Sequence, residues 1–282
     1  MDRASFDMRS YAGKEAQIQI VDMNTAGWGH LLADRFTATD TAAKSVVQRA
    51  DWADYGKDYY TAVSWENAPG GKRYMIGWMN NWDYSGVIPT SPWRGAQSIL
   101  GEMALRTVDG SILLTSRPVN RVWPLWQPHA VTASGVTVKS ASKTLIGPAA
   151  QGKALDIEAT LSLKDAERFG LKVRTGANGE ETVIGYDITT QELCTSTAPT
   201  PAPWTSTAPS RCPDRAEGRE RQGEAADPRR LVAVEVFGGS GAVSITDQIF
   251  PDPASQRVSV FAGNGSVKLD KAVVWHLDSA HK

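Results

Sequence analysis

The feature that most constrains this chain is a series of short segments with strand-like patterns, separated by turn residues. Most of the segments alternate apolar and polar side chains and are rich in β-branched and aromatic residues. Stretches such as Asn67–Gly71, Thr175–Gly179 and Gly263–Gly265 supply the turn chemistry between them. Many short strands with regular turns predict an all-β protein, either a propeller or a sandwich, with a helix only in a short piece near Lys164–Arg168. The predicted strands are Ala16–Val21, Tyr60–Trp65, Tyr74–Met79, Ser111–Thr115, Ala154–Leu161, Leu171–Arg174, Glu181–Tyr186, Leu231–Phe237, Ala242–Thr246, Arg257–Phe261 and Lys271–Trp275.

Charge and hydropathy exclude several classes of partner. With 30 basic and 31 acidic residues the chain is close to neutral, so we expect neither nucleic acid nor a membrane surface as its partner. The start of the chain has no apolar signal segment, and no apolar run is long enough to span a bilayer. The cysteines, Cys194 and Cys212, are too few for a disulfide framework and have no histidine pattern beside them. The sequence therefore predicts a globular protein with no metal site.

Tryptophan is abundant, with ten in 282 residues. The apolar face of a sugar ring packs well on an indole, while its hydroxyls reach polar neighbours. This favours a neutral carbohydrate as the partner. For any single tryptophan, packing in the core of a β protein remains the alternative.

Three irregular stretches interrupt the strand pattern. Prolines and small polar residues mark one boundary between residues 120 and 150, and a smaller break lies near residue 40. Residues 194–230 differ in kind, because they are rich in Pro, Thr and Ser and then highly charged. Their composition predicts a disordered linker.

Several motifs, in order along the chain, resemble one known family. They resemble the distal half of glycoside hydrolase family 32, the β-fructosidases that include levanases, exo-inulinases and invertases. The resemblance covers about residues 41–193 and 231–280, while residues 5–40 resemble the last strands of a β-sandwich module inserted in some bacterial levanases. The motifs are Asp54–Tyr60, Ile76–Trp82, Pro89–Gly95, Val234–Gly239, Thr246–Pro251 and Val274–Leu277.

The resemblance implies a fold and a location. The expected fold is all-β, a partial five-bladed β-propeller followed by a C-terminal β-sandwich. Residues 1–40 would be the end of the inserted module, 41–125 the distal propeller blades, and 126–282 the sandwich, with 194–230 anomalous. The resemblance also implies an extracellular protein without a cofactor that acts on a fructan or a sucrose-like carbohydrate.

The same resemblance implies retaining hydrolysis, which needs two carboxylates about 5 Å apart. The family carries its functional carboxylates in Asn-Asp-Pro-Asn-Gly, Arg-Asp-Pro and Glu-Cys-Pro motifs, and none of these occurs here; Arg211–Pro213 has Arg where the last needs Glu. Asp54 and Glu66 are the carboxylates that could substitute, but nothing in their spacing supports that role, and we expect them at solvated loop positions. We therefore predict no catalytic residue in this chain, which is expected to begin after the motifs and to be inactive alone. A complementing upstream fragment or a longer reading frame would restore the enzyme, and a non-catalytic fructan-binding module is the alternative.

The candidate sugar-binding residues are drawn from two of the motifs. On an extended strand Ile76, Trp78, Asn80 and Trp82 share one face. Trp82 is the preferred fructose contact, whereas Trp78 either lines the site or packs between blades. The predicted substrate-binding set is Trp82, Trp78, Asn80, Tyr59 and Asp58, with turn or core roles as the alternative for the last two.

The stretch 194–230 admits a second explanation. Codons for Gly223–Val232, read in a shifted frame, can encode an alternating strand, and so can codons for Cys194–Pro199 in another frame. Out-of-frame translation and a genuine low-complexity linker therefore both remain open, and the gene sequence distinguishes them.

Overall fold

The structure is a computed structural model that describes residues 3–23, 25, 33–43, 52–108, 110–119, 126–127, 131–144, 147–198, 205–209, 215–221 and 233–278. The chain divides into two units, residues 1–52 and 53–282.

The first unit contains one turn of 3₁₀ helix, Arg9–Tyr11, and no strand among its described residues. The strand predicted at Ala16–Val21 is therefore wrong. Alternation supplies an apolar face, but a strand also needs a neighbour for its backbone hydrogen bonds, and Ile18 and Ile20 stay exposed. The assignment of residues 1–40 to an inserted module stays a prediction. Residues 44–51, next to the predicted break, lie outside the described part.

The second unit begins with one antiparallel sheet, here called the first sheet. Its strands follow the order β1-β2-β4-β5, with β3 paired to β2. The connections from β1 to β2, β3 to β4 and β4 to β5 are short, as antiparallel neighbours allow, whereas residues 80–95 form a longer connection between β2 and β3. The strands are β1 (Tyr60–Ser64), β2 (Arg73–Met79), β3 (Ala96–Gln97), β4 (Gly101–Val108) and β5 (Ser111–Pro118), and a 3₁₀ turn, Pro69–Gly71, precedes β2.

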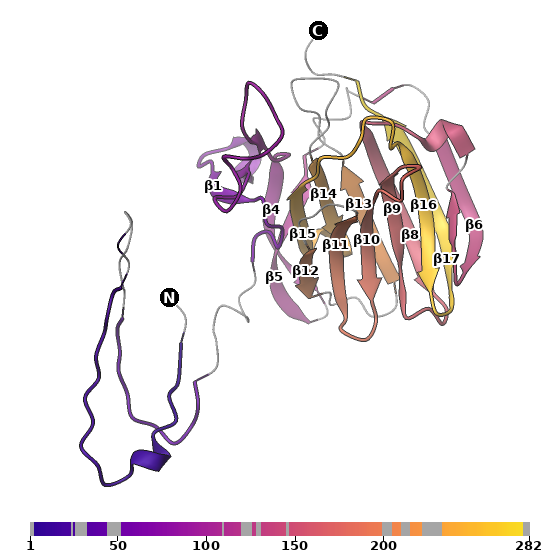
Figure 1. The fold of residues 1–282 in the computed structure, drawn as a ribbon. Helices are drawn as coiled ribbons and strands as arrows, with labels where there is room; N and C mark the ends of the chain where they lie inside the picture. Colours follow the sequence, from indigo (N-terminus) through magenta and orange to yellow (C-terminus); the bar gives the residue numbers. More distant parts are fainter. Residues whose placement is uncertain are drawn as a thin grey trace. The chain divides into compact units, whose positions relative to one another are not determined.

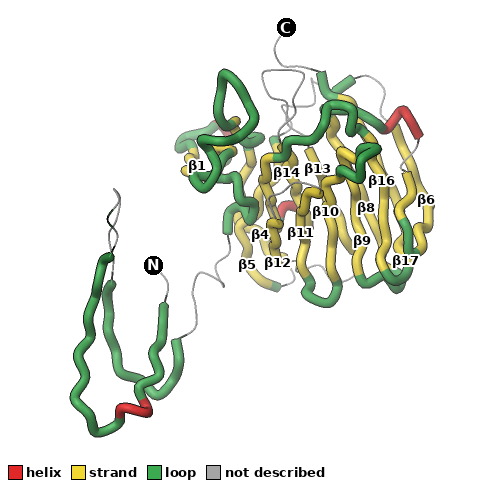
Figure 2. The backbone as a smooth tube through the Cα atoms, in the orientation of Figure 1, coloured by secondary structure: helices red, strands yellow, loops and turns green. Residues whose placement is uncertain are grey.

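Two six-stranded sheets make up the rest of the unit (Figure 1). One has the order β12-β11-β10-β9-β16-β7 and the other β15-β14-β13-β8-β17-β6. Figure 2 shows that almost all of this part is strand, with short loops at the strand ends. The strands are β6 (Val131–Lys139), β7 (Ser142–Thr144), β8 (Leu155–Leu163), β9 (Arg168–Thr175), β10 (Glu181–Asp187), β11 (Glu192–Ala198), β12 (Thr205–Pro209), β13 (Arg215–Arg221), β14 (Ala233–Gly238), β15 (Val243–Gln248), β16 (Arg257–Gly263) and β17 (Ser266–His276), with 3₁₀ turns at Gly147–Ala150 and Gly239–Gly241.

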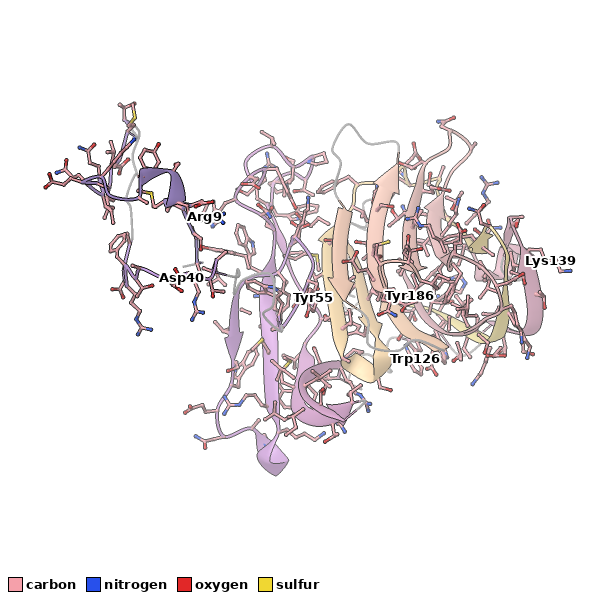
Figure 3. The ribbon with its side chains drawn as sticks, turned by 90° about the horizontal axis from the view of Figure 1, so that it is seen from below. Arg9, Asp40, Tyr55, Trp126, Lys139 and Tyr186 are labelled. Atoms are coloured by element: carbon pink, nitrogen blue, oxygen red, sulfur yellow. The ribbon has the colours of Figure 1, made fainter. Side chains whose placement is uncertain are left out.

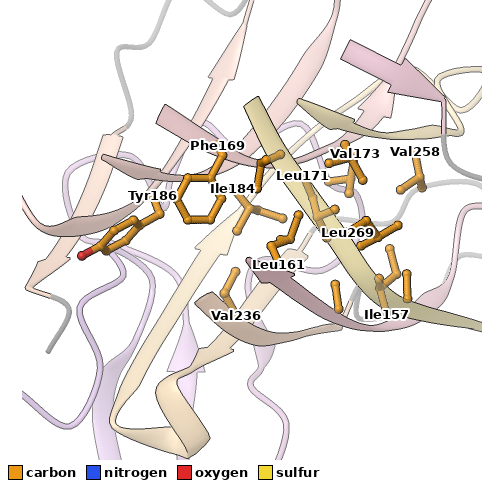
Figure 4. Close-up of a cluster of buried hydrophobic side chains, with 14 of the residues drawn as sticks. Ile157, Leu161, Phe169, Leu171, Val173, Ile184, Tyr186, Val236, Val258 and Leu269 are labelled. Atoms are coloured by element: carbon orange, nitrogen blue, oxygen red, sulfur yellow. The ribbon is translucent and has the colours of Figure 1, made fainter. Parts of the chain in front are cut away.

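The core lies between these two sheets. Figure 4 shows Phe169, Leu171 and Ile184 from one sheet facing Ile157 and Leu269 from the other, and all five are buried. Each side chain of this size contributes about 1.5–3 kcal/mol when it leaves water. The two sheets therefore form a β-sandwich, and the prediction of an all-β fold is confirmed.

The helix predicted near Lys164–Arg168 does not form. The backbone N–H groups of Lys164, Asp165 and Ala166 all donate to the carbonyl oxygen of Ser266, at the start of β17. The first N–H groups of a helix have no partner within it. These three N–H groups bond β17 instead, and the segment forms the bend between β8 and β9.

Strands also occupy much of the segment predicted as a linker. Within 194–230 lie most of β11 and all of β12 and β13, and β11 pairs with β10 from Glu181↔Ala198 to Asp187↔Glu192. Every residue except proline offers the same backbone donor and acceptor, so a partner strand can pair with a sequence of unfavourable composition. The linker prediction is wrong for these strands. Residues 199–204, 210–214 and 222–232 lie outside the described part, and the shifted reading frame stays a prediction.

Among the described residues, no helix is long and apolar enough to cross a membrane.

Candidate functional site

Three aromatic rings meet at one end of the first sheet, and we call them the aromatic cluster. The rings are Tyr60, Trp78 and Trp82, and each contacts the other two edge-to-face. The centroids lie 5.5 Å apart for Trp78 and Trp82, 6.0 Å for Tyr60 and Trp78, and 6.3 Å for Tyr60 and Trp82. Trp82 is 69% exposed and Tyr60 48% exposed. The cluster therefore offers aromatic surface to solvent while its rings support one another.

Strand pairing places Tyr60 in the cluster. Tyr60 is the cross-strand partner of Trp78, and β1 bulges between Tyr60 and Val63, with Thr61 at a positive φ of 47°. Bulges redirect side chains at the ends of sheets. Tyr59, one residue earlier, points to the opposite face and covers Gly77, where an added Cβ would lie 2.7 Å from the Tyr59 ring.

A buried amide lies beneath the cluster. Asn80 is fully buried, and its Oδ1 accepts a hydrogen bond from the backbone N–H of Asn81 at 2.8 Å. Its Nδ2 has no hydrogen-bond partner among the described residues. A Cβ added to Gly95 would lie 3.1 Å from Asn80 Nδ2 and 2.4 Å from Trp78 Nε1. Glycine at this position therefore lets the backbone close over two neighbouring N–H donors.

Trp82 lies beyond β2, in a turn that runs from Asn81 to Val87. The turn is stabilised by the Asp83 N–H donating to Asn81 Oδ1 at 2.9 Å and the Tyr84 N–H donating to the Asn81 carbonyl at 3.2 Å. The turn also bonds a second segment of the chain, through one residue before Trp82 and one residue after it. Asn81 Nδ2 donates to the Lys57 carbonyl at 2.8 Å, and the Tyr84 hydroxyl donates to Asp58 Oδ1.

That other segment, residues 54–58, covers the edge of the sandwich, and we call it the 54–58 turn. It lies along β15, the last strand in its sheet, whose outer edge is lined by backbone donors and acceptors. The Tyr55 N–H donates to the Ser244 carbonyl at 2.8 Å, and the Asp58 N–H donates to the Thr246 carbonyl at 3.1 Å. Tyr55 packs against the core of the sandwich (Figure 3).

Two carboxylates complete the outer edge of β15 by accepting hydrogen bonds from its outward N–H groups. Asp54 Oδ1 accepts from the Thr246 N–H at 2.9 Å, and Asp58 Oδ2 accepts from the Gln248 N–H at 2.8 Å. Asp54 Oδ2 also accepts from the hydroxyls of Ser244, at 2.7 Å, and Thr246, at 2.8 Å. The two side chains thus take the place of the carbonyl oxygens that a neighbouring strand would supply. The expectation that Asp54 occupies a solvated loop position is wrong, because the edge of β15 encloses its carboxyl group.

The structure brings together only some of the predicted sugar-binding residues. Trp78 and Trp82 share the aromatic cluster and Asn80 lies beside Trp78, whereas Tyr59 faces the other side and Asp58 lies behind the cluster, bonded to the sandwich. Direct sugar contact stays a prediction for all five. Sequence reasoning missed Tyr60, although its place at the start of a predicted strand was a usable signal.

The surroundings of the two aspartates shift their titration. Burial raises the pKa of Asp54 to about 6, against the opposing hydrogen bonds from Ser244, Gly56 and Thr246. Burial also raises the pKa of Asp58 to about 6; the Asp247 carboxylate adds to the shift, while Tyr84, the Gln248 N–H and Lys57 oppose it. At pH 7 both carboxyl groups are therefore ionised, and their ionisation lowers the free energy of unfolding.

This effect predicts how stability depends on pH. An aspartate in the unfolded chain titrates near pH 3.9, so between about pH 4 and pH 6 the native state binds more protons and gains stability as the pH falls. We expect the free energy of unfolding to be about 1–3 kcal/mol greater at pH 5 than at pH 7.5. Urea unfolding over this range measures it. In an Asp54→Asn/Asp58→Asn control, the free energy of unfolding should depend less on pH. A wild-type protein that loses stability as the pH is lowered from 7.5 to 5 would contradict the raised pKa of the two aspartates.

Among the described residues, no group of three His, Cys, Asp or Glu side chains is arranged to hold a metal ion.

Fold and site together define an all-β protein in which a sheet with an exposed aromatic cluster joins a two-layer sandwich. The chain belongs to glycosyl hydrolase family 32. The family's N-terminal domain model matches residues 11–117, and its C-terminal model matches residues 127–227 and 231–276. The predicted family membership is confirmed.

Characterised relatives and solved structures agree with this assignment. The chain is 31% identical to a levanase of Bacillus subtilis (88% of this chain, 37% of that protein) and 29% identical to an extracellular exo-inulinase of Aspergillus awamori (82% and 43%). The crystal structure of the Aspergillus awamori exo-inulinase superposes with a TM-score of 0.70 at 24% identity, over 86% of this chain and 46% of that one. Fructan 1-exohydrolase IIa of Cichorium intybus superposes with a TM-score of 0.63 at 18% identity, over 81% and 49%. The chain thus spans less than half the length of these proteins. Their propeller-and-sandwich architecture confirms the predicted fold class.

Proposed function

We propose that this chain contributes one wall of the sugar site of a β-fructosidase, and that its aromatic cluster binds a fructose unit of a fructan or a sucrose-like carbohydrate. The observation that carries the proposal is the edge-to-face cluster of Tyr60, Trp78 and Trp82, with Trp82 mostly exposed at the end of a sheet. Aromatic faces in such a position bind the apolar side of a sugar, and rings that are already supported lose little entropy on binding.

The comparisons with known proteins support the same assignment. Relatives named levanase and extracellular exo-inulinase support a fructan as the ligand and an extracellular location.

We do not assign hydrolysis to this chain alone. Retaining glycosidases need a nucleophile and an acid/base about 5 Å apart, both facing the sugar. Three carboxylates that link the first sheet and its neighbouring segments to the sandwich are bonded to backbone N–H groups. Asp54 and Asp58 bond the edge of β15, and Glu235 accepts the Ile99 N–H through both oxygens, at 3.0 and 2.8 Å. Hydrolysis would then require carboxylates from a longer chain or from a complementing polypeptide. A non-catalytic fructan-binding role is the second candidate, because the same cluster serves it without those carboxylates.

The purified chain tests the proposal directly. The probe is 1-kestose, the ligand in one solved structure of the Cichorium intybus enzyme, and maltotriose is the control without fructose. We expect saturable binding of 1-kestose, weaker binding of maltotriose, and no fructose release from levan, inulin or sucrose. Release of fructose would overturn the proposed inactivity, and absence of 1-kestose binding would overturn the sugar site.

A further inference from the structure

Trp82 is the most exposed ring of the aromatic cluster, yet it lies in a turn rather than in a strand. Its neighbours in the cluster, Tyr60 and Trp78, are fixed by the pairing of β1 with β2. The orientation of Trp82 depends instead on the attachments of its own turn, which come from Asn81 and Tyr84.

Both attachments lead to the 54–58 turn. Asn81 bonds the Lys57 carbonyl, and Tyr84 bonds Asp58 Oδ1, while Asp58 Oδ2 accepts from the backbone of Gln248 in β15. The Asp58 carboxylate, only 2% exposed, therefore links two elements: the turn that contains Trp82 and the edge strand β15.

We propose that Asp58 is a positioning residue of the sugar site, through which β15 of the sandwich fixes the Tyr84 hydroxyl and hence the orientation of Trp82. The inference rests on the proposed function and deepens it. The sandwich then takes part in sugar recognition without touching the sugar.

The chemistry of the link favours a fixed geometry. Hydrogen bonds to an ionised carboxylate are shorter and about twice as strong as neutral ones, and burial keeps water from replacing them. Burial and the bond to Asp58 both raise the pKa of Tyr84, so its hydroxyl stays a donor. The carboxylate is itself held in place, because the Asp58 N–H bonds the Thr246 carbonyl and the neighbouring Lys57 N–H bonds Asp247 Oδ1 at 3.0 Å.

Tyr84→Phe is the informative variant, because it removes one hydroxyl and leaves the bonds between the 54–58 turn and β15 intact. Near-UV circular dichroism is measured for wild type and for Trp82→Ala. The difference between the two spectra is taken as the signal of an ordered Trp82 ring. Tyr74→Phe, a hydroxyl deletion on β2 of the same sheet, is the matched control. Binding of 1-kestose is measured on the same proteins.

We expect Tyr84→Phe to lose more than half of the Trp82 signal and to bind 1-kestose about tenfold more weakly, as the loss of one charge-assisted hydrogen bond implies. Its urea midpoint should be lower than that of wild type, because the buried Asp58 carboxylate loses one donor, but the protein should stay folded without urea. The spectrum of Tyr74→Phe should match that of wild type. A Tyr84→Phe protein that keeps the full Trp82 signal overturns the inference, and so does one that loses it only through general unfolding. If the signal is lost but wild type binds no 1-kestose, the positioning of Trp82 by Asp58 stands and the proposed sugar function falls.

Discussion

Replacing Gly56 by alanine is expected to lower the free energy of unfolding of the unit formed by residues 53–282 by about 3–5 kcal/mol. A Cβ at this position would lie 2.0 Å from the carbonyl oxygen of Thr246 and 2.3 Å from its nitrogen, both backbone atoms in the middle of β15. The clash is relieved only by moving the 54–58 turn away from the strand. That movement breaks the bonds of Asp54 and Asp58 with the edge of β15 and leaves buried donors without acceptors.

Gly86 provides the matched control for this substitution. It lies in the exposed turn after Trp82, and a Cβ added there meets no atom within 4 Å. We expect Gly86→Ala to change stability by less than about 0.5 kcal/mol in the same urea titration. Equal stability of Gly56→Ala and Gly86→Ala would mean that the turn does not bind β15 as described.

Replacing Trp82 by alanine is expected to weaken the binding of 1-kestose by about 30- to 100-fold, or about 2–3 kcal/mol. The substitution removes the exposed ring against which a sugar would stack, and a truncated aromatic anchor at the centre of a site costs this much. Stability should fall by no more than about 1 kcal/mol, since the ring is mostly exposed and loses only its edge-to-face contacts. Calorimetric titration measures the affinity, and urea unfolding measures the stability.

Trp65 serves as the control for loss of an exposed indole. It follows β1 and is 47% exposed. We expect Trp65→Ala to bind 1-kestose within about twofold of wild type, because one general surface contact contributes little to a specific site. Equal losses from Trp65→Ala and Trp82→Ala would argue for nonspecific adsorption of the sugar.

Much of the fold could be predicted from the sequence because strand patterns are local. Alternation and turn residues located β2, β8 and β16 to within a few residues of their observed ends. The errors arose where backbone pairing prevailed over composition. The strand β6 forms in a stretch chosen as a boundary for its prolines and small residues, and most of β11 lies in the segment whose proline content and charge predicted a linker. Pairing partners distant in the chain decide such cases, and no local pattern contains them.

The candidate site was only half predictable for the same reason. Trp78 and Asn80 were placed on one side by the alternation of a strand, and the structure brings both beside Gly95. The role of Asp58 could not be predicted, because it depends on β15, which lies 190 positions further along the chain. A buried carboxylate that replaces a strand carbonyl leaves no signature in the local sequence.

The most direct test of the account uses the indole N–H signals of the chain's ten tryptophans in a two-dimensional NMR spectrum. Trp78→Phe and Trp82→Phe variants assign the two signals of the aromatic cluster, and 1-kestose is then titrated into the wild-type protein. The account predicts shifts concentrated at Trp78 and Trp82, with one common dissociation constant. Shifts confined to tryptophans of the sandwich such as Trp275, or no shift at any indole at saturating sugar, would contradict it.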